Sequence, residues 1–408
     1  MSYNVYKIGP TGATRGNAMK LARLSHFNSL RRYALVRLTR LFRGIDPDKV
    51  VFCCFNGTAY GDNPRCISER LHALRPGTKI VWLLTDGAAQ RLKPILPDYI
   101  TIATYRSDAA YRALATARVL VDNATQDRYL TLSEGRQFYV QTWHGDRAIK
   151  KICYDLNMPG DGRRLEERCA RVLTGSTFGE KLYRTAFRYK GAYIKAGSPR
   201  NDILVRGDPD RARAVRASLG VPGNTRLLLY APTYREKGDV IPKAASMDME
   251  RTLNRLEQKT GGKWMCLFRA HYLSAGIDLE AVQGRVVDAT SYPDMADLLL
   301  IADMVVTDYS SCALDFIVMD RPALFYMPDW QAYAADRGVY FDAPESPLMT
   351  AADQAGLEAL IDGLTPEGVL ANCAAIREYF GYYETGRATD AACEYIIGRL
   401  GSKDRMGD

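Results

Sequence analysis

The sequence predicts an α/β fold in which two Rossmann-like domains face each other across a cleft, preceded by a basic amphipathic helix. Short apolar strands alternate with helical patterns along most of the chain, which is typical of parallel, doubly wound sheets. The alternation restarts after the turn-forming stretch Val221-Pro222-Gly223-Asn224. The excess positive charge lies in the first 44 residues. These observations indicate four segments: 1–44, 45–205, 222–370 and 371–408.

The N-terminal segment carries nine lysines and arginines and no acidic residue, in a chain whose net charge is +8. Apolar residues recur at helical spacing over 17–43, which predicts an amphipathic helix on an anionic membrane surface. Two alternatives stay open: a helix packed on the body of the protein, and a nucleic-acid arm. Stacking platforms beyond the helix are missing, so no nucleic-acid partner is expected. The residues expected at the membrane are Phe27, Arg31, Arg32, Arg37, Leu38, Arg40, Phe42 and Arg43.

Composition argues against a membrane-spanning or disulfide-rich protein. Hydrophobic residues make up 47% of the chain, and its mean hydropathy is −0.24. It has no run of about 18 apolar residues, so no transmembrane helix is expected, and the N-terminus lacks the apolar core of a signal peptide. The nine cysteines show no C-x-x-C spacing, and several, such as Cys53, Cys54 and Cys266, lie in apolar runs. They read as reduced core thiols, which predicts the cytosol, without zinc or disulfides.

The predicted strands divide into two sets, and two helices are expected to close the chain. Those of the first domain are Val50–Phe55, Ile80–Leu84, Ile100–Ala103, Val119–Val121, Phe138–Thr142, Val172–Thr174 and Tyr193–Lys195. Those of the second domain are Leu227–Tyr230, Met265–Phe268, Val286–Asp288, Met304–Thr307 and Ala323–Tyr326. The closing helices are expected at 366–381 and 388–400. Ligands of open α/β sheets bind beyond the carboxyl ends of the strands, so functional residues are expected at those ends.

Two of the four histidines, His144 and His271, lie at predicted strand ends. His144 stands between an apolar run and a glycine followed by a basic cluster, and His271 follows a strand and an arginine. A histidine beside a flexible backbone and fixed positive charge is well placed to move a proton next to an anion. Together the two predict phosphate chemistry. The alternative is that both are hydrogen-bonded structural histidines.

The stretch Thr307-Asp308-Tyr309-Ser310-Ser311 predicts an anion cradle. The strand is expected to end at Thr307 or Asp308, and Ser310 or Ser311 can cap the next helix. Free backbone N–H groups, hydroxyls and the helix dipole then favour an anion such as a diphosphate. The alternative is an ordinary serine cap.

Three further loops follow predicted strands. Arg235, after Ala231-Pro232-Thr233, could pair with a phosphate in bidentate fashion, although alone it reads as a surface arginine. The loops at 55–65 and 197–202 combine turn residues with basic and amide side chains. Each is also compatible with ordinary turn chemistry.

Taken in order, these motifs resemble the CDP-glycerol glycerophosphotransferase family, the primases and polymerases of teichoic acid and related capsule synthesis. The resemblance covers about residues 50–345 and implies a GT-B-like fold acting at the cytoplasmic face of the membrane. The motifs that carry it are Phe55-Asn56-Gly57, Asp62-Asn63-Pro64-Arg65, Gln141-Thr142-Trp143-His144-Gly145, Pro199-Arg200-Asn201-Asp202, Tyr230-Ala231-Pro232-Thr233, Arg269-Ala270-His271, Thr307-Asp308-Tyr309-Ser310-Ser311, Arg321-Pro322 and Tyr340-Phe341-Asp342.

The resemblance implies roles for these residues. His144 matches the family's proposed base for the acceptor hydroxyl, and His271 its second essential histidine, thought to support the departing group. The residues assigned to the donor are Thr233, Arg235, Arg269, Thr307, Asp308, Ser310, Ser311 and Asp315. Those assigned to the acceptor or a phosphate are Asn56, Gly57, Asp62, Arg65, Gly145, Arg147, Lys150, Lys151, Pro199, Arg200, Asn201 and Asp202.

The implied reaction moves an alditol phosphate, glycerol phosphate in the first place, from CDP-glycerol or CDP-ribitol to a hydroxyl of a membrane-linked acceptor. That acceptor is expected to be a lipid-linked glycan or a polyol phosphate. Attack on the β-phosphorus would release CMP, and positioning and charge stabilisation would do most of the catalysis. No metal site is indicated, and a loosely held Mg²⁺ on the donor would leave no motif.

The chain departs from the family pattern in two places. Tyr272 stands where many members have proline after the second histidine, and the stretch from Gly145 to Lys151 is one residue longer than the usual Gly-Thr-Pro-Leu-Lys-Lys. The second departure lies near the expected acceptor. Two rival functions remain: a GT-B glycosyltransferase using a nucleotide sugar, and a basic membrane- or nucleic-acid-binding module with a degenerate cleft.

Overall fold

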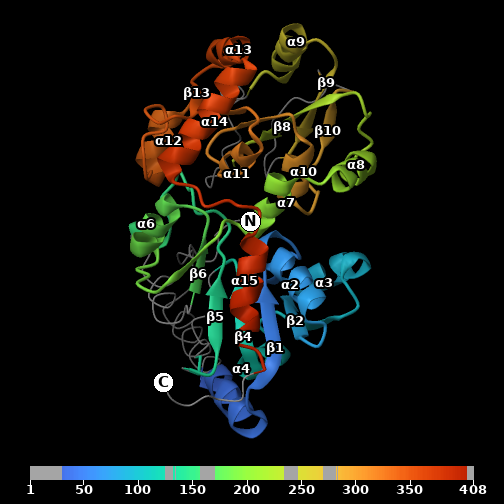
Figure 1. The fold of residues 1–408 in the computed structure, drawn as a ribbon, viewed down its shortest axis with the longest axis vertical. Coiled ribbons are helices and arrows are strands. Elements are labelled where there is room, and N and C mark those ends of the chain that lie inside the picture. Colours follow the sequence, from blue (N-terminus) through green and yellow to red (C-terminus); the bar gives the residue numbers. More distant parts are fainter. Residues whose placement is uncertain are drawn as a thin grey trace, which may run out of the picture.

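The computed structural model describes residues 30–124, 132–133, 135–156, 171–233, 247–269, 282 and 284–401. It contains two α/β units stacked along the long axis of the molecule (Figure 1). Each has a central parallel sheet, so the predicted class of two facing Rossmann-like domains is confirmed. Arg235 and His271 lie outside the described residues, as do residues 1–29 with Phe27.

The first sheet has seven strands in the order β3-β2-β1-β4-β5-β6-β7. Alternate residues of its central strand β1 enter opposite cores: Val50 and Phe52 join one, and Val51 and Cys53 join the other. Because both faces are buried, the strands read as continuous apolar runs. The bounds are β1 Asp46–Cys53, β2 Lys79–Leu84, β3 Ile100–Thr104, β4 Ala117–Asp122, β5 Phe138–Gln141, β6 Arg171–Thr174 and β7 Tyr193–Lys195.

The second sheet has six strands in the order β10-β9-β8-β11-β12-β13. All were predicted except β13, which has only three residues and is partly exposed, so it shows no apolar run. The bounds are β8 Arg226–Ala231, β9 Trp264–Phe268, β10 Val286–Asp288, β11 Met304–Thr307, β12 Ala323–Tyr326 and β13 Met349–Ala351.

Helices cover both faces of each sheet, and many begin at a side chain that accepts a hydrogen bond from the first turn. Ser107 and Ser176 cap α4 and α6 in this way, and Asp208 caps α8. The bounds are α2 Asp62–Leu74, α3 Asp86–Leu92, α4 Asp108–Thr116, α6 Thr177–Ala186, α7 Asp202–Arg206, α8 Pro209–Ser218, α9 Met249–Thr260, α10 Met295–Ile301, α11 Cys312–Phe316, α12 Trp330–Arg337, α13 Gln354–Gly363, α14 Pro366–Phe380 and α15 Ala388–Ile397. Short 3-10 helices are η1 Phe55–Gly57, η2 Lys93–Ile95, η3 Cys153–Leu156, η4 Pro199–Asn201 and η7 Ile317–Met319.

The end of the chain crosses back from the second domain to the first. Cys373 and Phe380 on α14 belong to the core of the second domain, whereas Cys393 and Ile396 on α15 belong to a core of the first. Figure 1 shows α15 lying along the first sheet. The boundary expected at residue 370 is therefore misplaced, because it falls inside the continuous helix α14.

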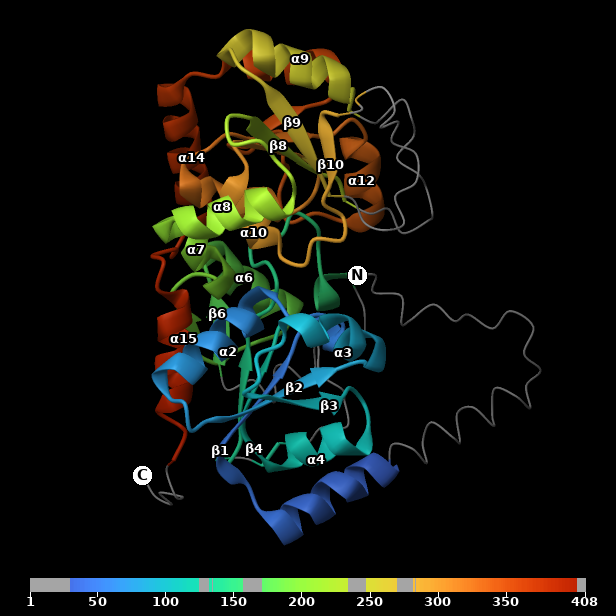
Figure 2. The same cartoon turned by 90° about the vertical axis from the view of Figure 1, so that its right-hand side faces the viewer.

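The described part of the predicted N-terminal helix, residues 30–43, is helical and lies beside α4 at the end of the first domain away from the second (Figure 2). Val36 is fully buried there with Tyr111 and Ala115 of α4. Among the helices that the structure describes, none combines the length and the apolar character needed to cross a bilayer.

Candidate active site

A cavity of about 220 Å³ lies between the two domains, where the carboxyl ends of strands from both sheets meet. The first domain contributes His144 after β5, and the second contributes Arg269 after β9 and two serines after β11. Other lining residues come from the loop after β1 and from the start of α10. The polar residues around it are Asp62, His144, Arg200, Asn201, Arg269, Asp294, Ser310, Ser311 and Asp315.

His144 is held as a neutral imidazole with one free nitrogen. Its Nδ1 lies 2.6 Å from the carbonyl oxygen of Asn123, which can only accept, so Nδ1 carries the proton and Nε2 keeps its lone pair. Burial lowers the pKa of His144 to about 4, against the Asn123 contact and the carboxylate of Asp62, which raise it. At neutral pH the imidazole can therefore accept a proton at Nε2.

The loops after β1, β4 and β5 lock this imidazole in place. Asn123 binds His144 through its carbonyl and accepts the Phe55 N–H through its side chain at 2.8 Å. The ring stacks on the buried Trp143 at 4.4 Å between centroids, and Phe55 lies tilted against it at 5.3 Å. Asn123 was not predicted from the sequence, although an asparagine directly after a buried strand indicates a loop in which side-chain and backbone hydrogen bonds fix the conformation.

Asn63 ties the histidine loop to the loop that carries Arg200. Its side-chain amide donates to the carbonyl of Trp143 at 3.0 Å, and its oxygen accepts the Arg200 N–H at 3.1 Å. Asn63 is 1% exposed, so neither bond competes with bulk water. It stood inside a recognised motif but was not singled out as a site residue.

The two domains lie close together at Gly145. Its φ is +151°, and a Cβ there would lie 2.7 Å from the Ser311 hydroxyl of the second domain. A side chain at this position would push the serine away from His144. The glycine therefore brings the histidine loop and the serine pair to the same cavity.

The second domain presents Ser310, Ser311 and Arg269 to the cavity. Ser311 stands at the start of α11 without capping it through its side chain, and the Ser310 hydroxyl accepts a long bond of 3.4 Å from the Cys312 N–H. Arg269 donates to the Tyr292 carbonyl at 2.7 Å, and burial lowers its pKa. Ser310, Ser311 and Arg269 therefore line the cavity together, and their role as an anion cradle stays a prediction.

Other residues assigned to the donor serve the fold instead. Thr307 is fully buried, and its hydroxyl donates to the Ala231 carbonyl at 2.6 Å. The Asp308 carboxylate accepts hydrogen bonds from the Thr233 N–H, at 2.8 Å, and from the Thr233 hydroxyl. These bonds join the ends of β8 and β11. The expectation that these side chains bind the donor is corrected, because their polar groups are used within the sheet edge.

A buried ionic cluster joins the two domains beside the cavity. Arg147, with a side chain 1% exposed, donates to Asp315 of α11 at 2.8 Å and to Glu384 at 3.0 Å, and lies 4.3 Å above the Tyr382 ring. Arg200 binds the other oxygen of Asp315 at 2.7 Å. Arg147 and Asp315, assigned to the acceptor and the donor, form a buried interdomain ion pair, and Asp315 also lines the cavity.

The same cluster anchors the C-terminal crossing. Glu384 accepts from the Asn201 amide at 3.0 Å and from the Ser198 N–H at 3.0 Å, and burial raises its pKa to about 7. Asp202 accepts from the N–H groups of Ala388 and Thr389 and so holds the start of α15. Asn201 and Asp202 thus hold this crossing in place, while Asn201 also lines the cavity and Asp202 lines a larger cavity next to it. Glu384 was missed because it lies outside every recognised motif and far along the sequence.

The remaining acceptor residues divide between the cavity and the periphery. Asp62 and Arg200 line the cavity and pair with each other at 3.0 Å. The exposed Asn56 accepts from the Tyr105 hydroxyl, and Gly57 has a φ of +79° with no room for a Cβ against Tyr105. These two shape the turn after β1 and do not line the cavity.

Lys150 and Lys151 lie in a second contact between the domains. Lys150 forms an antiparallel bridge with Val339, and the Lys151 N–H donates to the Gly338 carbonyl at 3.0 Å. Lys150 is also close enough to His144 to help lower its pKa.

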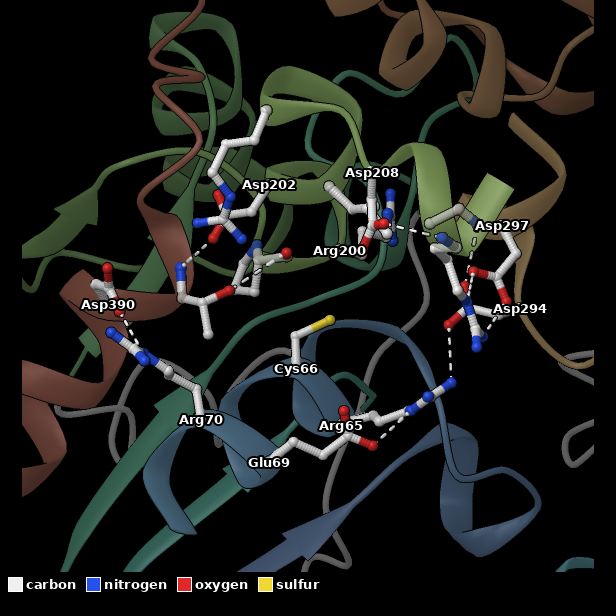
Figure 3. Close-up of a pocket in the computed structure, with 16 residues that line it drawn as sticks. Arg65, Cys66, Glu69, Arg70, Arg200, Asp202, Asp208, Asp294, Asp297 and Asp390 are labelled. Carbon is white, nitrogen blue, oxygen red and sulfur yellow. Dashed lines mark hydrogen bonds and ion pairs between the residues drawn. The ribbon is translucent and has the colours of Figure 1, made fainter. Parts of the chain in front are cut away.

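A larger cavity of about 590 Å³ adjoins the first and shares Arg200, Asp294 and Ala296 with it. Arg65, predicted to contact the acceptor, and Pro199 line this second cavity. Figure 3 shows Arg65, Cys66, Glu69 and Arg70 projecting from α2 toward residues of the second domain and of α15. Within the described ranges, no group of three or more His, Cys, Asp or Glu side chains could hold a metal ion.

Two parallel α/β domains that place a neutral imidazole opposite a serine pair define a protein of the GT-B-like class. A family model for CDP-glycerol:poly(glycerophosphate) glycerophosphotransferases matches residues 35–398, and the chain belongs to that family.

Individual relatives agree with this assignment. A teichoic acid poly(glycerol phosphate) polymerase of Bacillus subtilis (strain 168) is 28% identical over 85% of this chain and 48% of its own length, so the chain spans about half of that relative. A teichoic acid glycerol-phosphate transferase of Staphylococcus aureus (strain NCTC 8325 / PS 47) is 28% identical over 85% of this chain and 92% of its own. A structure of the wall teichoic acid polymerase TagF, a histidine variant soaked with CDPG, is 25% identical, with a TM-score of 0.78 over 95% of this chain and 98% of its own.

Replacing Arg147 with alanine should destabilise the protein strongly. The change leaves Asp315 and Glu384 buried without their shared cation, and breaking such a pair costs about 3–5 kcal/mol. The free energy of unfolding is measured by urea titration. Arg251→Ala removes an exposed arginine paired with Glu358 and serves as the control, with an expected loss below about 1 kcal/mol. Equal losses in the two variants would contradict the assignment.

Proposed function

We propose that this protein transfers glycerol phosphate from CDP-glycerol to a hydroxyl of a membrane-linked, teichoic-acid-like or capsule polymer precursor, with release of CMP. The single observation that carries the proposal is the neutral, buried His144 in the interdomain cavity. Membership of the family, and the TagF structure soaked with CDPG, support the choice of donor.

His144 acts in this proposal as the general base. Its Nε2 takes the proton of the acceptor hydroxyl, while the hydroxyl oxygen forms a bond to the β-phosphorus of the donor. The bond between that phosphorus and the bridging oxygen breaks, and CMP leaves with the bonding electron pair. The imidazolium then returns its proton to solvent. A neutral imidazole with Nδ1 anchored on Asn123 fits this role, because the ring cannot turn away when it gains charge.

The serine pair and Arg269 hold the donor diphosphate in this proposal. Ser310 and Ser311 offer hydroxyl donors, and Arg269 offers a guanidinium in a site largely shielded from water. CDP-ribitol would undergo the same chemistry. A glycosyltransferase would instead attack carbon and release a nucleoside diphosphate, so the nucleotide released from a panel of CDP-alditols decides between the two functions.

We also propose that the N-terminal helix docks the protein on the cytoplasmic face of an anionic membrane. Leu38, Leu41 and Phe42 are 53%, 75% and 80% exposed on one side of the helix, opposite the buried Val36. Such an apolar stripe suits the headgroup layer of a bilayer.

Fewer arginines of this helix are available to lipid than the sequence suggested. Arg31 binds both oxygens of Asp108, Arg40 donates to Gln137, and Arg32 lies 5.2 Å from the Tyr111 ring centroid. These three hold the helix against the body of the protein. Arg37 and Arg43 are exposed on the helix, and Arg37 also contacts Tyr33. Apolar burial should therefore carry a large share of membrane binding.

His144→Ala should lower kcat by about two to four orders of magnitude, the usual cost of losing a general base. Donor affinity should change little, because the proposed donor contacts lie on the other domain. CMP release is measured with CDP-glycerol and a lipid-linked acceptor. His72→Ala is the control, since His72 stacks on Tyr99 away from the cavity. Wild-type turnover in a folded His144→Ala protein would exclude His144 as the base.

The pH profile gives a second check on the same residue. Only the neutral imidazole can take a proton, and burial lowers the pKa of His144 from 6.5 to about 4. When kcat/KM is measured as a function of pH, its value should therefore persist as the pH falls through 6.5 and decline only near pH 4.

Ser310→Ala combined with Ser311→Ala should weaken donor binding by about 1–3 kcal/mol, the range for losing two neutral hydrogen bonds. Titration calorimetry with CDP-glycerol measures the dissociation constant. Ser218→Ala, on α8 outside the cavity, should leave it unchanged. An unaltered affinity in the double variant would show that the serines serve only the start of α11.

Replacing Leu38, Leu41 and Phe42 together with glutamine should release the protein from anionic vesicles and spare activity on short soluble acceptors. Sedimentation with vesicles at graded salt measures binding. Leu370→Gln is the control, because Leu370 is 51% exposed on α14 of the other domain. If the triple variant sediments as well as the wild type at every salt concentration, the helix is only a packed element of the fold.

A further inference from the structure

The larger cavity beside the catalytic one is lined by charges that balance each other. It presents five arginines and six carboxylates from α2, α7, α8, α10, α15 and the turns before them. Arg70 binds Asp390 at 2.7 Å, Arg211 binds Asp297 at 2.5 Å, and Arg65 lies between Glu69 and Asp294. Figure 3 shows Arg70 directed toward Asp390, and Arg65 directed toward Glu69 and Asp294.

Further polar groups of the cavity are also paired within the protein. Asp202 accepts two backbone N–H groups of α15, and Asp208 accepts the Arg211 N–H at 2.8 Å. Arg206 donates to the Gly386 carbonyl at 2.8 Å. The cavity therefore carries no excess of positive charge, unlike a surface that binds a run of phosphates.

The larger cavity adjoins the smaller one, which His144 lines. Arg200, Asp294 and Ala296 line both spaces, so a molecule seated in the larger cavity would lie next to the smaller one. The donor contacts proposed above lie at the end of the second sheet, which leaves the space between α2 and α10 for the other substrate.

We propose that this cavity is the acceptor site, and that it takes an uncharged, hydroxyl-rich group, such as the sugar of a glycan acceptor, in preference to a chain of glycerol phosphates. Guanidiniums donate and carboxylates accept hydrogen bonds, so a lining of both satisfies hydroxyl groups as donors and as acceptors. A chain of phosphates would bind less tightly, because each arginine that attracts a phosphate has a carboxylate beside it that repels the phosphate. This inference rests on the proposed function and assigns its acceptor.

The test compares two soluble acceptors, a neutral disaccharide glycoside and the same glycoside extended by several glycerol phosphates. Binding is measured by titration calorimetry and turnover by CMP release from CDP-glycerol. In the wild type the neutral acceptor should bind about tenfold more tightly, which corresponds to about 1.4 kcal/mol. Equal affinity, or tighter binding of the extended acceptor, would overturn the charge argument.

A blocking variant tests the location. Cys66 lines the larger cavity and not the smaller one, so Cys66→Trp should weaken acceptor binding by about tenfold or more and leave CDP-glycerol affinity unchanged. Ala73→Trp is the matched control, since Ala73 is exposed on the same helix and lines neither cavity. Unchanged acceptor affinity in a folded Cys66→Trp protein would overturn the assignment.

A conservative variant tests the charge balance without a bulky side chain. Asp208→Asn combined with Asp390→Asn leaves the cavity with more arginines than carboxylates, and asparagine still caps α8. This change should strengthen binding of the phosphate-extended acceptor relative to that of the neutral one. No shift toward the extended acceptor would contradict the inference.

The two readouts separate the inference from the proposed function. If the wild type releases no CMP but binds the acceptor, and Cys66→Trp abolishes that binding, the acceptor site is supported and the proposed reaction is wrong. If Cys66→Trp binds the acceptor as the wild type does and still releases CMP, the proposed reaction is supported and the acceptor site is wrong.

Discussion

The arrangement of the site depends on the burial of one guanidinium, that of Arg147, between two carboxylates from distant parts of the chain. Asp315 belongs to α11 of the second domain, and Glu384 to the segment that returns to the first. A buried charge without its partner costs several kcal/mol, so the histidine loop, α11 and the C-terminal segment are held together. This cluster places the His144 imidazole of one domain beside the serine hydroxyls of the other.

The cluster also explains why many charged residues near the cavity are unavailable to a ligand. Arg200 shares Asp315 with Arg147 and also pairs with Asp62, while Asn201 bridges Asp315 and Glu384. A small set of groups lining the cavity keeps hydrogen-bonding capacity for a ligand. In that set a neutral imidazole faces two serine hydroxyls and an arginine, which suits proton removal beside a bound anion.

In the proposed function, the position of the N-terminal helix constrains how a membrane-linked acceptor reaches the cavity. The helix lies at the end of the first domain away from the second, whereas the catalytic cavity lies between the domains (Figure 2). An acceptor anchored in a bilayer under this helix has to extend past the first sheet to approach His144. A cavity that opens toward α2 and α15 on the flank of the first domain offers such an approach.

The sequence by itself determined the fold class, nearly all the strands and the two strand-end loops that meet at the cavity, because buried parallel strands leave continuous apolar runs and their ends leave turn residues. It did not reveal β13, which is too short to form such a run, or the return of α15 to the first domain. The roles of Arg147, Asp315 and Thr307 were also decided only by the tertiary structure. A charged or hydroxyl side chain after a strand reads the same whether it faces a ligand or a buried partner. Glu384, more than two hundred residues from Arg147, becomes its partner only when the chain crosses back between the domains.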